Sequence, residues 1–164
     1  MKSAVVYYSY NGNTKKVAGV LSEILSAKGS VEVFALRAQD ESNNFLRQCK
    51  RAFSNTRATL EEVNFELGPY DVICFGTPVW AFAPAPAMNT YLDKCAGVAG
   101  KDVVLFSTYG SGTGKNRCLK LMQNILSRKG AKSFKAFGVQ QGKVQDKEFV
   151  LSQIKAVMPL SPNG

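Results

Sequence analysis

Short polar side chains fill the turn after the first apolar run of the chain, and their chemistry is that of an anion-binding site. The turn comprises Ser9, Tyr10, Asn11, Gly12, Asn13 and Thr14. Hydroxyl and amide groups donate hydrogen bonds, and glycine lets a ligand approach the backbone closely. A helical pattern follows the turn, so the unpaired N–H groups and the dipole of a helix N-terminus also favour negative charge there. The turn therefore predicts a phosphate site, with Thr14 as the helix N-cap.

Two later segments each combine one large aromatic residue with backbone that carries little side chain. Residues 77–84 are rich in proline, and residues 108–114 are rich in glycine. A flat ligand ring can stack between two aromatic side chains, while exposed N–H groups bond its polar edge. The candidate contact residues are Thr77, Pro78, Val79, Trp80, Thr108, Tyr109, Gly110, Ser111 and Gly112.

The pattern of apolar residues predicts the elements that must position these segments. Strands are expected at residues 4–8, 31–36, 72–76, 103–106 and 134–139, and helices near 15–25, 45–53, 87–95, 119–126 and 147–158. Strands that alternate with helices indicate right-handed crossovers and a parallel sheet. We expect one domain over residues 1–164, an α/β doubly wound fold with five parallel strands in the order 2-1-3-4-5 and helices on both faces. In that order the three polar segments meet at the carboxyl edge of the sheet.

Composition excludes several functional classes. The chain has 164 residues, 45% hydrophobic and 20% charged, as in one globular domain. It contains no histidine, which excludes Ser-His and Cys-His hydrolytic schemes, and its four cysteines lack metal-ligand spacing. The Gly-rich segment after residue 109 has Asn116 where a P-loop needs Ser or Thr. Neither a secretory leader nor a membrane span is indicated, so we expect a cytoplasmic protein without membrane insertion.

The positive charge is concentrated in the second half of the chain. The net charge is +9, and residues 101–164 hold eleven Lys and Arg against three Asp and Glu. A basic face of this kind is either simply solvated or attracts an anionic partner. No nucleic-acid-binding motif accompanies it, so no nucleic acid is expected as a partner.

The three segments together resemble the flavodoxin family. The resemblance rests on Ser-x-x-Gly-x-Thr at residues 9–14, Thr-Pro-x-Trp at 77–80 with a later Ala-Pro, and Tyr109 in the third segment. It covers nearly the whole domain and is greatest with the short-chain FMN proteins. It implies FMN as the cofactor, with its phosphate on residues 9–14 and its ring between Trp80 and Tyr109.

The resemblance leaves two kinds of function open, and departures from the carrier pattern favour one of them. Flavodoxin carriers typically have a glycine beside the flavin in the second loop and acidic residues around the ring. Here residues 77–93 contain no glycine, and residues 103–145 contain no acidic residue. We therefore favour an NAD(P)H-dependent oxidoreductase that passes electrons through FMN to a quinone-like acceptor, with no catalytic side chain. The alternative is a non-enzymatic electron carrier that docks to redox partner proteins.

Overall fold

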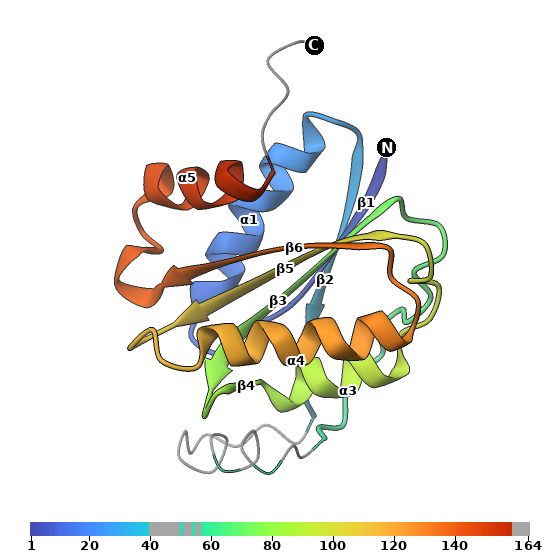
Figure 1. The fold of residues 1–164 in the computed structure, drawn as a ribbon, viewed down its shortest axis with the longest axis horizontal. Helices are drawn as coiled ribbons and strands as arrows, with labels where there is room; N and C mark the ends of the chain where they lie inside the picture. Colours follow the sequence, from blue (N-terminus) through green and yellow to red (C-terminus); the bar gives the residue numbers. More distant parts are fainter. Residues whose placement is uncertain (40–49, 51–53, 55–56, 159–164) are drawn as a thin grey trace.

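The protein is built around a parallel sheet in the order β2-β1-β3-β5-β6, with a short strand β4 paired to β3 (Figure 1). The computed structural model describes residues 1–39, 50, 54 and 57–158. If β4 is left out of the count, this order is the predicted 2-1-3-4-5. The prediction of a doubly wound α/β fold is confirmed.

The elements lie close to their expected positions. Their bounds are β1 Lys2–Tyr8, α1 Asn13–Ser26, β2 Ser30–Leu36, β3 Val72–Trp80, β4 Ala83–Pro84, α3 Pro86–Lys94, β5 Asp102–Tyr109, α4 Lys115–Arg128, β6 Ser133–Gln140, the 3₁₀ helix η1 Gln141–Lys143 and α5 Lys147–Val157. The expected helix at residues 45–53 lies outside the described residues.

Helices cover both faces of the sheet, so the sheet has a hydrophobic core on each side. Helices α1 and α5 lie on one face, and α3 and α4 lie on the other (Figure 1). In β1, Val6 packs into the core beneath α3 and α4, while its neighbour Val5 packs into the core beneath α1. Successive side chains of a strand point to opposite faces, which is why the central strands are apolar without interruption.

Strand β3 is longer than predicted, and the proline-rich segment is a hairpin rather than an irregular loop. β3 continues to Trp80, and β4 returns along it with Val79 paired to Pro84. Proline is tolerated in this strand because pairing with β1 ends at Gly76, before Pro78 is reached. The two turn residues, Ala81 and Phe82, have φ of 46° and 67°, as a tight hairpin turn requires.

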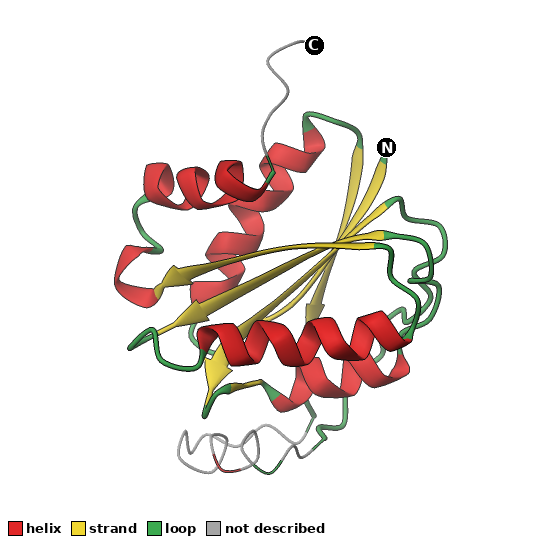
Figure 2. Ribbon diagram, in the orientation of Figure 1, coloured by secondary structure: helices red, strands yellow, loops and turns green. Residues whose placement is uncertain are grey.

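The carboxyl ends of β3, β5 and β6 lie at one edge of the sheet (Figure 2). The loops that follow these strands are therefore neighbours in space, as the strand order predicts. Among the helices of the described residues, none combines the length and the apolar character needed to span a membrane.

Candidate functional site

Two adjoining cavities form one cleft at the carboxyl edge of the sheet. They have volumes of about 340 and 290 Å³, and they share Trp80 and Gln141. The first is lined by Val79, Trp80, Ala81, Phe82, Tyr109, Gly110, Ser111, Thr113 and Gln141, and the second by Tyr10, Asn11, Pro78, Trp80 and Gln141. All three segments singled out in the sequence therefore contribute to one site.

The turn after β1 leads directly into helix α1, but its N-cap differs from the prediction. The helix begins at Asn13, so the cap is Gly12 with φ of 87°, and Thr14 lies within the first turn. Thr14 is only 1% exposed, and a hydrogen bond of 2.8 Å joins its Oγ1 atom to Oγ1 of Thr108 in β5. The Thr14 hydroxyl thus connects the first and third segments of the site. The prediction that Thr14 caps the helix is wrong, because glycine adopts the left-handed cap conformation with less strain.

The hydroxyl of Ser9 is buried at the start of this turn. Its Oγ atom has no hydrogen-bond partner among the described residues. Burying a hydroxyl without a hydrogen-bond partner destabilises the folded protein, so such groups usually bond to water or to a ligand. Ser9 lies four positions before Asn13, the first residue of α1, and the first turn of a helix leaves backbone N–H groups without intrahelical acceptors. This arrangement suits an anion.

Aromatic residues form the wall between the turn and the hairpin. Trp80 is 4% exposed, and its ring meets Tyr8 and Tyr10 edge-on at centroid distances of 5.7 and 5.5 Å. Trp80 therefore lines both cavities while most of its surface packs in the core. Tyr109 is half-buried at the end of β5 and lines the first cavity only.

The sequence of this chain matches a known family over most of its length. The family model described as Flavodoxin matches residues 2–150. The chain belongs to the flavodoxin family.

Solved structures with the same fold include several proteins that bind or reduce flavin. One is a candidate flavoprotein from Bacteroides eggerthii DSM 20697, with a TM-score of 0.73 and 18% identity over 97% of this chain and 99% of that one. Another is a flavoprotein from Lactobacillus acidophilus NCFM in complex with FMN, with a TM-score of 0.65 and 21% identity over 90% and 98%. A third is an NADH:FMN oxidoreductase in its apo form, with a TM-score of 0.65 and 20% identity over 99% and 92%. At these identities the likeness shows the shared fold.

Three of the candidate contact residues, Thr14, Thr77 and Thr108, are buried and line neither cavity. Thr77 is buried, and its Oγ1 accepts a hydrogen bond of 3.0 Å from the Ala85 N–H at the end of the hairpin. Thr108 is buried as well and contacts Thr14. These threonines therefore hold the walls of the cleft in place.

Several lining residues of the flavodoxin cleft were not among the candidates. Gln141 lines both cavities, and its neighbour Gln140 donates a hydrogen bond of 3.1 Å from Nε2 to the Gly110 carbonyl. Gln140 is the last residue of β6 and Gln141 follows it, so the rule that ligands bind at the carboxyl edge of the sheet could have pointed to both. Ala81 and Phe82 also line the cleft, and neither is a residue type that indicates a turn with positive φ.

The cleft is uncharged, and a cation stands next to it. No Asp or Glu is among the described residues that line the two cavities. The Lys115 Nζ atom lies 5.3 Å from the centroid of the Tyr109 ring, in a cation–π contact. Arg117, two positions farther along α4, lines a neighbouring cavity instead.

Of the cysteines that the structure describes, none lines the two cavities of the cleft. Cys74, Cys95 and Cys118 are buried free thiols, and burial raises the pKa of Cys74 and of Cys118 to about 12. At neutral pH these thiols stay protonated and unreactive. The fourth cysteine, Cys49, lies outside the described residues.

Replacing Thr14 with Val should destabilise the flavodoxin fold at the site. The change keeps the shape of the side chain but leaves the buried Thr108 hydroxyl without its 2.8 Å partner. The free energy of unfolding is expected to fall by about 1–3 kcal/mol, which thermal denaturation of the apoprotein would detect. Thr14→Ser keeps the hydroxyl and is the control. Equal melting temperatures for Thr14→Val and wild type would contradict a structural role for this bond.

Replacing Tyr109 with Leu should weaken the binding of a flat aromatic ligand. The half-buried ring lines the first cavity, and an aromatic pair contributes about 0.5–1.5 kcal/mol beyond burial. We expect flavin affinity, measured by fluorescence quenching, to fall several-fold in Tyr109→Leu and to change little in Tyr109→Phe. Unchanged flavin affinity in Tyr109→Leu would show that Tyr109 does not contact the flavin.

Proposed function

We propose that this chain binds FMN in the cleft, with the phosphate at residues 9–14 and the ring in the cavity beside Tyr109. The partnerless Ser9 hydroxyl and the start of α1 fit a phosphate, which accepts hydrogen bonds and carries negative charge. The two cavities together provide the space of a typical small-molecule site. The proposed contact residues are Ser9, Tyr10, Asn11, Gly12, Asn13 and Thr14 in the turn, Pro78, Val79 and Trp80 in the hairpin, and Tyr109, Gly110, Ser111 and Gly112 after β5. Thr77 and Thr108 are proposed to support them.

We further propose that the protein is an NAD(P)H-dependent oxidoreductase that passes electrons through FMN to a quinone-like acceptor. The observation that carries this proposal is the electrostatic environment of the cleft: none of the described residues that line it is acidic, and Lys115 stands behind Tyr109. Bound FMN supplies the redox chemistry, and it gains negative charge when fully reduced at neutral pH. Acidic surroundings would oppose that charge, whereas a neighbouring cation favours it. The residues of this chain hold the cofactor and set its electrostatic environment.

The hairpin supports the same proposal over the electron-carrier alternative. Trp80 pairs with Ala83 in the β3–β4 ladder, and the Ala85 N–H is bonded to Thr77, so the turn is held at both ends. The turn residues Ala81 and Phe82 are not glycines and already have positive φ. A carrier that stabilises the half-reduced flavin through a peptide flip needs a backbone that can rearrange at low cost, and this hairpin is poorly suited to that.

Anaerobic mixing of the FMN-loaded protein with NADH or NADPH tests the proposed function. We expect at least one of the two to bleach the flavin absorbance without an intermediate spectrum, and a benzoquinone added afterwards to restore it. Flavin that stays oxidised with both nucleotides, yet is reduced by dithionite through a long-lived half-reduced form, would support the electron carrier instead.

A further inference from the structure

A third cavity adjoins the cleft on the side of α3 and α4. Its volume is about 390 Å³. It is lined by Arg57, Ala81, Phe82, Ala83, Asn89, Asp93, Arg117, Leu121, Asn124, Ile125 and Arg128. We call it the arginine groove. It shares the turn residues Ala81 and Phe82 with the cleft, so these two residues separate the two spaces.

Helix α4 contributes one long wall of the arginine groove, with a cation near each end. Arg117 and Arg128 are eleven positions apart, which corresponds to about 16 Å along an α-helix. Leu121 and Ile125 lie between them, on the same wall. Among the described residues, neither arginine makes an ion pair. The wall therefore presents two available guanidinium groups on either side of an apolar strip.

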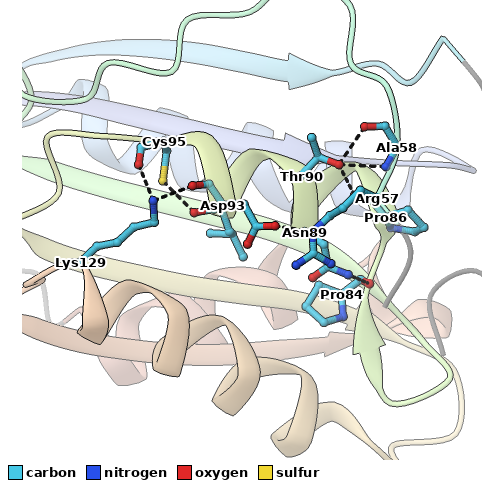
Figure 3. Close-up of polar contacts among 10 residues, drawn as sticks. Arg57, Ala58, Pro84, Pro86, Asn89, Thr90, Asp93, Cys95 and Lys129 are labelled. Carbon is cyan, nitrogen blue, oxygen red and sulfur yellow. Dashed lines mark hydrogen bonds and ion pairs between the residues drawn. The ribbon is translucent and has the colours of Figure 1, made fainter. Parts of the chain in front are cut away.

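The opposite wall, formed by α3, has its polar groups already satisfied (Figure 3). Asp93 is paired with Arg57, which neutralises the acidic residue of the groove. Asn89 donates a hydrogen bond of 3.1 Å from Nδ2 to the Pro84 carbonyl. Nearby, Lys129 Nζ donates to the Asp93 and Cys95 carbonyls, at 2.7 and 2.8 Å (Figure 3). Among the described residues that line the groove, the charges outside the Arg57–Asp93 pair are positive and belong to Arg117 and Arg128 on the α4 wall.

Phe82 marks the passage between the groove and the cleft. Its side chain is 41% exposed, and it lies against Gly114, where a Cβ atom would come within 2.4 Å of the Phe82 ring. Arg117 is the arginine close to this end of α4, and Arg128 is at the far end. A ligand that extends from the cleft along the groove would meet Phe82, then Arg117, then the apolar strip and finally Arg128.

We propose that the arginine groove holds the phosphorylated adenosine half of a pyridine dinucleotide whose nicotinamide ring reaches the flavin cleft. This inference rests on the proposed function. The phosphorylated adenosine carries anionic groups on the 5′ and 2′ carbons of one ribose and a flat, largely apolar base on the same sugar. Leu121 and Ile125 can therefore hold the base while the cations on either side reach the two phosphates. Guanidinium groups bind phosphate oxygens with two parallel hydrogen bonds, so they suit both positions. Arg117 receives the pyrophosphate, and Arg128 receives the phosphate on the adenosine ribose.

Calorimetric titration of the FMN-loaded protein with adenosine 2′,5′-bisphosphate tests the groove without requiring any flavin chemistry. This probe carries the adenosine and its phosphates but has no nicotinamide. We expect it to bind, and we expect Arg128→Gln and Arg117→Gln each to weaken it about tenfold, because each removes a charge-assisted contact. Lys120→Gln removes the same charge from α4 outside the groove and should leave binding unchanged.

The outcomes separate this inference from the proposed function. Absence of binding, or binding that the two arginine variants leave unchanged, would overturn the groove assignment even if NADPH bleaches the flavin. Binding that depends on both arginines would support the proposed role of the groove, even if neither nucleotide reduces the flavin. A failure of both nucleotides to reduce the flavin would count only against the proposed oxidoreductase function.

Discussion

Replacing Ser9 with Asp is expected to weaken FMN binding by roughly two to three orders of magnitude. Among the described residues, the Ser9 hydroxyl is buried without a hydrogen-bond partner, and it lies at the start of the turn before α1, where we place the phosphate. A carboxylate about 4 Å from a phosphate charge is repelled by roughly 4 kcal/mol at an effective dielectric constant of about 20, and solvent reduces this value. Fluorescence titration of the apoprotein with FMN measures the loss.

Two further variants show whether the loss comes from charge at the proposed site. Ser26→Asp places the same charge on an exposed position at the other end of α1 and should bind FMN as the wild type does. Ser9→Ala removes the hydroxyl without adding charge, so its affinity should fall far less than that of Ser9→Asp. A folded Ser9→Asp protein with wild-type affinity for FMN would show that the phosphate binds elsewhere.

Reversing the charge of Lys115 should make the bound flavin harder to reduce fully. Lys115 lies against Tyr109 at the edge of the cleft. A unit charge about 10 Å from the ring contributes roughly 1–2 kcal/mol before salt screening. In Lys115→Glu we expect the potential of the second electron step to fall by tens of millivolts, and more half-reduced flavin to accumulate than in the wild type.

A redox titration with optical detection measures this effect, and the position of Lys115 makes the variant practical. Lys115 is the first residue of α4, and a helix tolerates an acidic side chain well at its N-terminus. Lys120→Glu makes the same change farther along α4 and should shift the potential less. If wild-type protein already accumulates a long-lived half-reduced flavin at very low potential, the carrier function is favoured, and Lys115 does not promote full reduction of the flavin as proposed.

The fold could be predicted from the sequence because its signals are local and repeated. Apolar runs such as residues 72–76 and 103–106 are typical of strands covered on both faces, and their alternation with helical patterns indicates the doubly wound order. The same order placed the polar segments at one edge. The convergence of the three loops on one site could therefore be predicted from the strand order, without knowledge of side-chain contacts.

The finer structure of the site could not be predicted because it depends on contacts between distant segments. The hydrogen bond between Thr14 and Thr108 joins residues 94 positions apart, so the sequence around Thr14 does not indicate it. The β3–β4 hairpin has Ala81 and Phe82 where glycine or asparagine would have signalled a turn with positive φ. The arginine groove likewise depends on how α4 packs beside α3, which decides where Arg117 points.

Comparison of FMN and riboflavin as ligands of the wild-type apoprotein tests whether the turn after β1 holds the phosphate. The two molecules share the same ring and ribityl chain, and they differ only in the phosphate that we place at residues 9–14. If the turn holds that phosphate with the Ser9 hydroxyl and the N–H groups of α1, FMN should bind at least about a hundredfold more tightly, since charge-assisted hydrogen bonds contribute about 1.5–3 kcal/mol each. Equal affinities for FMN and riboflavin would contradict the account.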